Sequence, residues 1–321
     1  MKYNAAVIGL GQIGQGYDYD YHDESLVLTH SSGYKFHNSF NLVAGVDNNK
    51  DYCSMFEKKY NVQTFNCVNE MMEKCNPDVI SISTSTNTHF DIYKKVAYYS
   101  PKAILLEKPI SENINQANHI ISNAKKNGIV LFVNYLRRFE PGTNNLKKMI
   151  SNGLIGEIYK GNVWYCKGLK NNGSHFIDLL MYLFGDVENV KMISSGRSFD
   201  SLGYKDVEPD FLLEFNNTNI IFQSSRSECF SLGEFVLIGT KGSLYYGNGK
   251  IEYKLTKPDS IVKDYTILQT EPINIKTDFN RSQFFVMDSI VNYFEKKRDI
   301  YSDGDSALKT LKIIEKIISL R

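Results

Sequence analysis

The sequence predicts an α/β protein in two parts, a doubly wound parallel sheet followed by an α/β domain with an open, mostly antiparallel sheet. Short apolar runs alternate with helical patterns from residue 3 to about residue 133, as in βαβ units. After about residue 155 the pattern changes to β-rich alternation. The length of 321 residues fits two domains. We therefore expect one domain over residues 1–135 and a second over residues 136–321.

The parallel sheet is expected to contain five strands, which correspond to apolar runs at residues 5–10, 41–46, 78–83, 103–106 and 129–133. A helix is expected before the last of these runs, capped by Ser111 and closed by Gly128. Its apolar residues recur at helical spacing and form one stripe, made of Ile114, Ala117, Ile121 and Ala124. This stripe is predicted to pack against the sheet.

Two hairpins are expected in the second part. Residues 211–215 and 220–222 flank Asn216-Asn217, and residues 234–246 turn at 239–242. The end of the chain returns to helical spacing over residues 284–294 and again from Ala307 to Ile318. The antiparallel sheet is thus expected to be followed by two helices.

Composition excludes several classes of protein. Lys and Arg number 37 against 36 Asp and Glu, a net charge of +1, which gives no reason to expect nucleic acid or an anionic membrane as partner. No apolar run approaches the roughly 18 residues of a membrane span. The five cysteines form no C-x-x-C pair, which fits neither a disulfide framework nor a zinc ribbon. We expect a soluble, cytoplasmic protein.

A glycine-rich turn follows the first expected strand, with the sequence Gly9-Leu10-Gly11-Gln12-Ile13-Gly14. Such glycines permit a tight turn, close approach of the backbone to a pyrophosphate, and close helix packing. A plain turn between strand and helix is the alternative. The position directly after a strand in a βαβ context favours a dinucleotide site of the Rossmann type, formed by Gly9, Gly11, Gln12, Ile13 and Gly14.

An acidic residue, Asp47, ends the second expected strand. A carboxylate there accepts hydrogen bonds from the ribose hydroxyls and repels a 2′-phosphate, which favours NAD over NADP. The interval from Gly14 to Asp47 is 47 − 14 = 33 residues, whereas about 20 is usual. The excess is residues 16–28. We expect a solvated insertion that acts as a lid near the cofactor; a metal site made from its acidic residues and His22 is the alternative, and no metal is predicted.

A series of motifs in order makes the sequence resemble one oxidoreductase family. They are the glycine turn, Ala44-Gly45-Val46-Asp47, residues 84–89, Glu107-Lys108-Pro109, residues 134–141, residues 153–158, Gly173-Ser174-His175-Phe176-Ile177-Asp178, and Gly239-Thr240-Lys241-Gly242. The family is named after glucose-fructose oxidoreductase, inositol dehydrogenase and the rhizopine catabolism protein (Gfo/Idh/MocA). The match spans nearly the whole chain. It implies a Rossmann domain that binds NAD, followed by a substrate-binding and oligomerisation domain.

The resemblance implies roles for two catalytic residues. Lys108 falls on the lysine that contacts the reacting hydroxyl, where an ammonium stabilises a developing alkoxide. His175 falls on the histidine that takes the hydroxyl proton, a task that suits imidazole because its ordinary pKa is near 6.5. A surface lysine and a core or capping histidine are the structural alternatives. The resemblance also implies cofactor contacts from Thr84, Ser85, Asn87, His89, Glu107 and Lys108.

The substrate is expected to lie against Tyr135, Arg138, Asn171 and Asp178. Asp178 lies one helical turn after His175 and shares its face, although a carboxylate on the helix surface is an alternative. Asn171 departs from the family, which often has Asp four residues before the histidine. An amide supplies no negative charge to raise the pKa of a neighbouring base. Thr84-Ser85 is a smaller departure from the family's Thr-Pro or Ser-Pro.

These residues together predict an NAD-dependent oxidoreductase. The expected reaction moves a hydride between nicotinamide and a carbinol carbon of a sugar, an inositol or a nucleotide-linked sugar. Two alternatives stay open: a dinucleotide-binding regulator of the same fold without catalysis, and a redox-neutral enzyme that retains NAD(H) and recycles it. The resemblance further implies a homodimer or homotetramer.

Overall fold

The computed structural model describes residues 2–201 and 204–321. The chain divides into two compact units, which we describe separately. Unit 1 contains residues 1–139 and 279–311, and unit 2 contains residues 140–278 and 312–321. A single boundary after residue 135 is expected from the sequence, whereas in the structure residues 279–311 also belong to the first unit. Among the described residues, no helix combines the length and the apolar character needed to cross a membrane.

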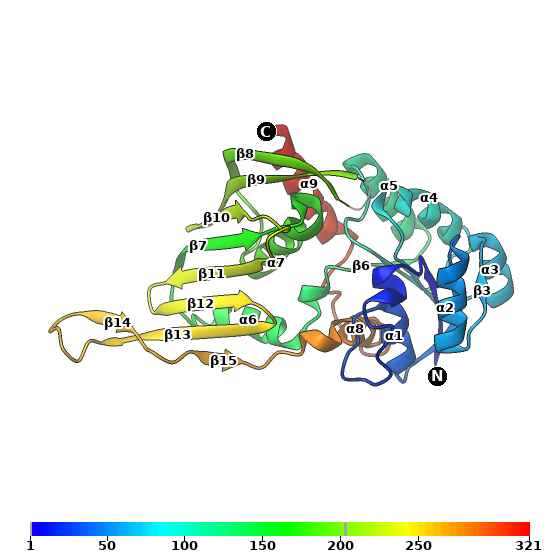
Figure 1. Cartoon of the computed structure of the whole chain (residues 1–321), viewed down its shortest axis with the longest axis horizontal. Helices are drawn as coiled ribbons and strands as arrows, with labels where there is room; N and C mark the ends of the chain where they lie inside the picture. The colour runs from blue at the N-terminus through cyan, green and yellow to red at the C-terminus, as the bar shows by residue number, and fades with distance from the viewer. Residues whose placement is uncertain (1, 202–203) are drawn as a thin grey trace. The chain divides into compact units, whose positions relative to one another are not determined.

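Unit 1 is built on a six-stranded parallel sheet in the order β3-β2-β1-β4-β5-β6, whose two edge strands, β3 and β6, are labelled in Figure 1. Its strands are β1 (Tyr3–Ile8), β2 (Phe40–Val46), β3 (Thr64–Phe65), β4 (Val79–Ile82), β5 (Ala103–Leu106) and β6 (Val130–Val133). Strand order reverses between β1 and β4, and in open α/β sheets ligands bind beside the carboxyl ends of strands at such a reversal. The predicted doubly wound parallel sheet is confirmed, with β3 as a strand that the sequence analysis does not include.

Helices cover both faces of this sheet. One core layer takes its helical residues from α3 (Val68–Cys75), α4 (Thr86–Ala97), α5 (Ile114–Lys126) and the start of α9 (Gly304–Ser319). The other layer involves α1 (His30–Phe36), α2 (Lys50–Tyr60) and α8 (Ser282–Lys296). The apolar side chains of α8, including Val286, Met287 and Ile290, are buried beside Ala5 and Val7 of β1. This burial is the physical reason why the late segment belongs to unit 1.

Helix α5 has the predicted apolar stripe but a different cap. Ala117, Ile121 and Ala124 are buried as expected. The N-cap is Asn113, whose side chain accepts a hydrogen bond from the backbone N–H of Gln116 at 3.0 Å. The predicted cap Ser111 instead donates its hydroxyl to the carbonyl oxygen of Asn113. The Ser111 prediction is therefore wrong, because Asn113 is the residue positioned one step before the first helical turn.

Unit 2 contains a nine-stranded mixed sheet with the order β14-β13-β12-β11-β7-β10-β9-β8, and β15 pairs with β13. The only parallel pair among its described ladders is β7 with β10. Its strands are β7 (Ile158–Tyr165), β8 (Asn189–Ser201), β9 (Tyr204–Phe215), β10 (Thr218–Ser224), β11 (Gly233–Gly239), β12 (Gly242–Gly247), β13 (Lys250–Pro258), β14 (Thr266–Leu268) and β15 (Ile273–Ile275). The predicted open, mostly antiparallel sheet is confirmed.

The two predicted hairpins are present in this sheet. β9 and β10 pair antiparallel around Asn216-Asn217, and β11 pairs antiparallel with β12 around Thr240-Lys241. The helices of unit 2 are α6 (Pro141–Ser151) and α7 (Ser174–Phe184), together with the later part of α9. Most side chains of α7 are buried. This packing fixes the start of the helix, where His175 lies.

Candidate active site

The glycine turn at the end of β1 has a backbone that only glycine accommodates at two positions. Gly9 has φ +94°, and a Cβ added there would lie 2.7 Å from the backbone of Ser83 and Thr84. A Cβ added to Gly14 would lie 2.1 Å from the carbonyl oxygen of Gly9. The turn is therefore tight and packs directly against the end of β4. These are two of the three tasks that a dinucleotide-binding turn gives to its glycines.

The third task is to leave room for a ligand beside the backbone, and Gly11 meets it. A Cβ added to Gly11 would have no described atom within 4 Å. A short π-helical turn, η1 (Gln12–Gly16), begins at the next residue. The first N–H groups of a helical turn have no partner within that turn and point outward, which suits an anionic group. The residues present thus fit the pyrophosphate of a dinucleotide.

Asp47 lies at the end of β2 and connects that strand to the glycine turn. Its Oδ2 accepts a hydrogen bond from the N–H of Leu10 at 2.7 Å, and its Oδ1 accepts one from the N–H of Asn49 at 2.8 Å. A carboxylate has about four acceptor sites, so these two bonds leave capacity for hydroxyl donors. Asp47 also lines an open cavity of about 410 Å³ next to β3. Contact with ribose stays a prediction.

The loop from β4 to α4 is held to the glycine turn and to the residues that follow β5. The Ser83 hydroxyl donates to the carbonyl oxygen of Gly9 at 2.8 Å. His89 is completely buried, with Nε2 at 3.0 Å from the Thr84 carbonyl oxygen and Nδ1 at 3.0 Å from that of Pro109. Burial lowers the pKa of His89, although its hydrogen bonds to carbonyl groups oppose this. We therefore infer that His89 serves the cofactor site by holding two loops.

Thr84, Ser85 and Asn87 surround the start of α4. Ser85 is the N-cap residue of this helix, and the Thr88 hydroxyl donates to the Thr84 hydroxyl at 2.8 Å. All three lie at the carboxyl end of β4, beside the reversal of strand order. This is the edge at which dinucleotides bind in such sheets. Contact of Thr84, Ser85 and Asn87 with the cofactor stays a prediction.

Glu107 and Lys108 follow β5 directly. The Glu107 carboxyl group is buried and bonded to two side chains, His30 at 2.9 Å and Asn134 at 2.5 Å, both through Oε1. Its Oε2 accepts the backbone N–H of Lys108 at 3.2 Å. Burial by itself would raise the pKa of Glu107, but the hydrogen bonds from His30 and Asn134 and the charges of His30 and Lys108 outweigh it, so the pKa is lowered. Glu107 is therefore a buried carboxylate that is hydrogen-bonded to the backbone of Lys108.

The insertion after the glycine turn is only partly solvated. Its residues 20–25 are exposed, but Asp18 and Val27 are buried. Asp18 accepts hydrogen bonds from the backbone of Leu28 at 2.8 Å and of Thr29 at 3.1 Å, and Val27 exchanges backbone bonds with the 280–283 segment. The predicted solvated loop is thus wrong at both ends of the segment. The physical reason is that Asp18 satisfies the backbone where α1 begins.

Tyr135 and Arg138 both follow the end of β6 in unit 1. Arg138 lies in the short helical turn η2 (Leu136–Arg138), and both side chains are buried. Arg138 donates to the carbonyl oxygen of Tyr301 at 3.3 Å. The neighbouring Asn134 is the residue that bonds Glu107. The structure therefore brings this segment to the same sheet edge as Lys108.

Unit 2 carries the other predicted site residues on one continuous segment. Asn171 lies in a second π-helical turn, η3 (Gly168–Gly173), and His175 and Asp178 lie in the first turns of α7. His175 is half-buried and Asp178 is buried. Because they are three positions apart on a helix, their side chains share one face, as predicted.

Two buried carboxylates of β9, which the sequence analysis does not single out, hold this segment. Asp206 accepts the backbone N–H groups of Lys170 and Asn171, each at 3.2 Å. Glu208 accepts the N–H of Gly168 at 3.2 Å and pairs with Arg197 at 2.7 Å. Burial raises the pKa of Asp206, and the backbone hydrogen bonds partly oppose it. No sequence motif marks these residues; their acidic character at alternate positions of a strand is the one available signal.

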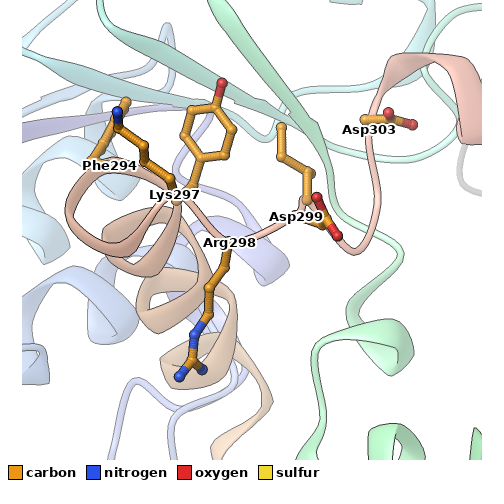
Figure 2. A pocket seen from close by; sticks show the side chains of 7 residues that line it. Phe294, Lys297, Arg298, Asp299 and Asp303 are labelled. Atoms are coloured by element: carbon orange, nitrogen blue, oxygen red, sulfur yellow. The ribbon is translucent and has the colours of Figure 1, made fainter.

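A second open cavity, of about 690 Å³, lies between the end of α8 and α9 and includes none of the predicted residues. Figure 2 shows Arg298 extending away from Asp299 and Asp303, so its charged groups do not converge on one point. Among the described residues, no group of three His, Cys, Asp or Glu side chains is arranged to hold a metal ion. The predicted residues therefore remain the candidate site.

The fold and the glycine turn define a dinucleotide-binding protein of the Rossmann class. Residues 3–135 match the family model described as "Oxidoreductase family, NAD-binding Rossmann fold", and residues 168–319 match "Oxidoreductase family, C-terminal alpha/beta domain". The chain belongs to this oxidoreductase family, the one that the sequence motifs resemble. NAD as the cofactor class is confirmed by the same match.

Curated relatives include enzymes that act on inositols and sugars. The chain is 30% identical over 152 residues to a myo-inositol 2-dehydrogenase of Thermotoga maritima, covering 47% of this chain and 41% of that protein. It is 26% identical over 218 residues to the D-glucoside 3-dehydrogenase of Escherichia coli, covering 62% and 58%. The chain thus spans less than two thirds of the length of these relatives.

A solved structure shares the fold along the whole chain. The WlbA dehydrogenase from Bordetella pertussis, in complex with NADH and UDP-GlcNAcA, superposes with a TM-score of 0.77 at 19% identity, covering 99% of this chain and 95% of that one. At this identity the likeness establishes the fold alone.

Proposed function

We propose that this protein is an NAD-dependent dehydrogenase that oxidises a carbinol carbon of a sugar, an inositol or a nucleotide-linked sugar, or reduces the corresponding ketone. The observation that carries the proposal is the sheet edge of unit 1, where an open glycine turn and the Glu107-Lys108 segment lie at the carboxyl ends of strands β1 and β5. Relatives with inositol and glucoside dehydrogenase activity support the substrate class.

The glycine turn and Asp47 would hold the dinucleotide. Backbone N–H groups at the start of η1 would receive the pyrophosphate, and the free acceptor capacity of Asp47 would receive ribose hydroxyls. Bound NAD⁺ supplies a hydride acceptor at its nicotinamide ring. The rigidity of the turn, set by the close packing of Gly9 and Gly14, fixes where the nucleotide can bind.

Lys108 and His175 would act on the substrate hydroxyl. The Lys108 ammonium donates a hydrogen bond to the hydroxyl oxygen and stabilises the negative charge that develops there as hydride leaves carbon. The neutral His175 imidazole accepts the hydroxyl proton, so that the alcohol becomes a ketone. Tyr135, Arg138, Asn171 and Asp178 would bind the other polar groups of the substrate.

The test begins with the nucleotide that co-purifies with the protein, identified by mass spectrometry. A panel of inositols, sugars and nucleotide-linked sugars is then assayed for NADH formation at 340 nm. Turnover of any member supports the proposal. Nucleotide binding without turnover of any member contradicts it and favours the regulator. Substrate conversion with bound NAD(H) and no net NADH favours the redox-neutral enzyme.

Asp47 is expected to set the choice between NAD(H) and NADP(H). Its carboxylate repels a 2′-phosphate, so NADH should bind at least about tenfold more tightly than NADPH, a margin of roughly 1.4 kcal/mol. Asp47→Asn should reduce this ratio, while Asp51→Asn, at an exposed position in the first turn of α2, should not. Calorimetric titration of both nucleotides checks this, and equal affinities in the wild-type protein would contradict it.

Asn171→Asp should shift the pH dependence of oxidation. A carboxylate close to His175 or Lys108 favours their protonated forms, so a base must lose its proton at higher pH. The acid limb of the kcat/KM profile should therefore move to higher pH. Asn172→Asp, at the next half-buried position, is the control for added charge alone. An unshifted acid limb in Asn171→Asp would place residue 171 too far from the acid/base groups.

We also propose that a second copy of this chain covers the outer face of the sheet in unit 2. Ile221 and Val236 both lie opposite Asn162 on neighbouring strands and are 39% and 37% exposed. Trp164, two residues along β7, is 37% exposed, so this face carries an apolar row. Sedimentation should detect a homodimer or homotetramer, and Trp164→Lys should shift it toward the monomer. A monomeric wild-type protein would overturn this proposal.

A further inference from the structure

The structure contains a buried three-residue network directly behind Lys108. His30 is fully buried at the first position of α1, and its Nε2 lies 2.9 Å from Oε1 of Glu107. The amide nitrogen of Asn134, at the end of β6, donates to the same oxygen at 2.5 Å. Three elements that are distant in sequence therefore meet at one carboxylate.

The other oxygen of this carboxylate reaches the backbone of the proposed catalytic residue. Oε2 of Glu107 accepts the N–H of Lys108 at 3.2 Å. The turn that follows is held from the other side by His89, which contacts the Pro109 carbonyl oxygen. A shift of the Glu107 side chain would therefore release one of the contacts that fix the backbone from which Lys108 projects.

The insertion determines where His30 lies. Thr29 is the N-cap of α1, and its hydroxyl donates to Oδ1 of Asp18 at 2.7 Å. Lys59 of α2 donates to the Asp18 carbonyl oxygen at 2.6 Å. Asp18 of the insertion thus fixes Thr29 at the start of α1, and with it the position of the histidine that follows the cap.

The chemistry of this network indicates that His30 does more than fill the core. A buried carboxylate requires hydrogen-bond donors, and the loss of one donor from a buried charged group is costly. Nδ1 of His30 has no hydrogen-bond partner among the described residues, whereas most buried polar groups have one. Among the described residues, Glu107 is therefore the hydrogen-bond partner that orients the ring.

We propose that His30 is a positioning residue of the dehydrogenase, which acts through Glu107 to fix the backbone of Lys108 and links the insertion at 16–28 to the catalytic lysine. This inference rests on the proposed function. His30 does not touch the substrate in this scheme. Its effect is therefore expected on the rate of the chemical step more than on nucleotide affinity.

The experiment compares two substitutions at His30 with one at a matched histidine. His30→Gln keeps a donor for Glu107, and His30→Leu removes it. His37 is also buried, lies just after the same helix, and has Asp288 as its ionic neighbour at 3.8 Å. His37→Gln is therefore the control for disturbing a buried histidine beside α1 without changing the Glu107 network.

Displacement of a catalytic group by about 1 Å can cost about 100-fold in rate. We expect kcat to fall about 10- to 100-fold in His30→Leu and less in His30→Gln, with the Kd for NADH within about threefold of wild type. His37→Gln should keep kcat within about twofold while its Tm falls. Equal kcat values in folded His30→Leu and His37→Gln, or losses that follow NADH affinity, would overturn the proposal.

Hydrogen exchange gives a readout that needs no substrate. Amide exchange in a peptide covering residues 104–110 should be faster in folded His30→Leu than in wild type, and unchanged in His37→Gln. If the wild-type protein shows no dehydrogenase activity, the proposed function fails, and this measurement still tests the link. Unchanged exchange in folded His30→Leu would overturn the link itself.

Discussion

Lys108→Ala should reduce turnover by roughly two to four orders of magnitude, because it removes a group that acts on the transition state. The Kd for NADH should change little, since the glycine turn and Asp47 lie on other strands of the sheet. The backbone N–H of Lys108 still bonds Glu107 in this variant, so the local structure should persist. Steady-state kinetics and calorimetric titration of NADH check the two parts of this expectation.

Lys102→Ala is the matched control for Lys108→Ala, because Lys102 immediately precedes the same strand. Its ammonium forms an ion pair with Asp78 at 3.0 Å, and the side chain is 56% exposed. Surface pairs of this kind contribute roughly 0–1 kcal/mol to stability, so turnover should stay close to wild type. If Lys108→Ala also keeps turnover within a few fold, the catalytic role of Lys108 is wrong.

Most strands of unit 1 are predictable because each is a short, continuously apolar run between helical patterns. β5 has the predicted bounds, Ala103–Leu106, and β2 differs by one residue. The start of a helix is harder to predict where two polar residues could each be the N-cap, as Ser111 and Asn113 could for α5. Prediction also misses β3, which has only two residues and therefore shows almost no pattern.

The domain boundary cannot be predicted from local patterns. Residues 284–294 have helical spacing whichever domain they join, and only their packing against β1 places α8 in unit 1. The buried position of Asp18 is unpredictable for the same reason. An acidic residue in a polar segment is expected to be solvated, and only the structure shows that Asp18 accepts the backbone N–H groups of Leu28 and Thr29.

The motif residues of the site are predictable, and their supporting residues are not. Gly9 and Gly14 occupy positions that require glycine, so the spacing of these glycines in the sequence is enough to predict the turn. The contact of His30 with Glu107 joins residues 77 positions apart. Asp206 and Asn171 are 35 positions apart. Such contacts depend on tertiary packing, which a single sequence does not encode in any short pattern.

The segment before His175 depends on a glycine that lies against a buried carboxylate. Gly168 has φ +91°, and a Cβ added there would lie 2.0 Å from Oδ2 of Asp206. The same Asp206 carboxylate accepts the N–H groups of Lys170 and Asn171. Gly168→Ala therefore combines backbone strain with a clash against the group that organises the turn.

We expect Gly168→Ala to lower the free energy of unfolding by about 2–5 kcal/mol, as the sum of left-handed strain and overpacking. Gly153→Ala is the matched control in the same unit, because Gly153 has φ +77° and an added Cβ there meets nothing within 4 Å. It should cost only the strain, about 1–2 kcal/mol. Denaturant unfolding of both variants measures the difference.

Activity should separate the two glycine variants further than stability does. In folded Gly168→Ala the turn that leads into α7 must shift, so the His175 imidazole is displaced and kcat should fall by about 100-fold. Gly153→Ala should keep kcat near wild type, and both variants should bind NADH normally because the glycine turn lies in unit 1. Equal kcat values in the two folded variants would contradict a role for the Asp206 contact in positioning His175, and would leave Gly168 with a purely conformational function.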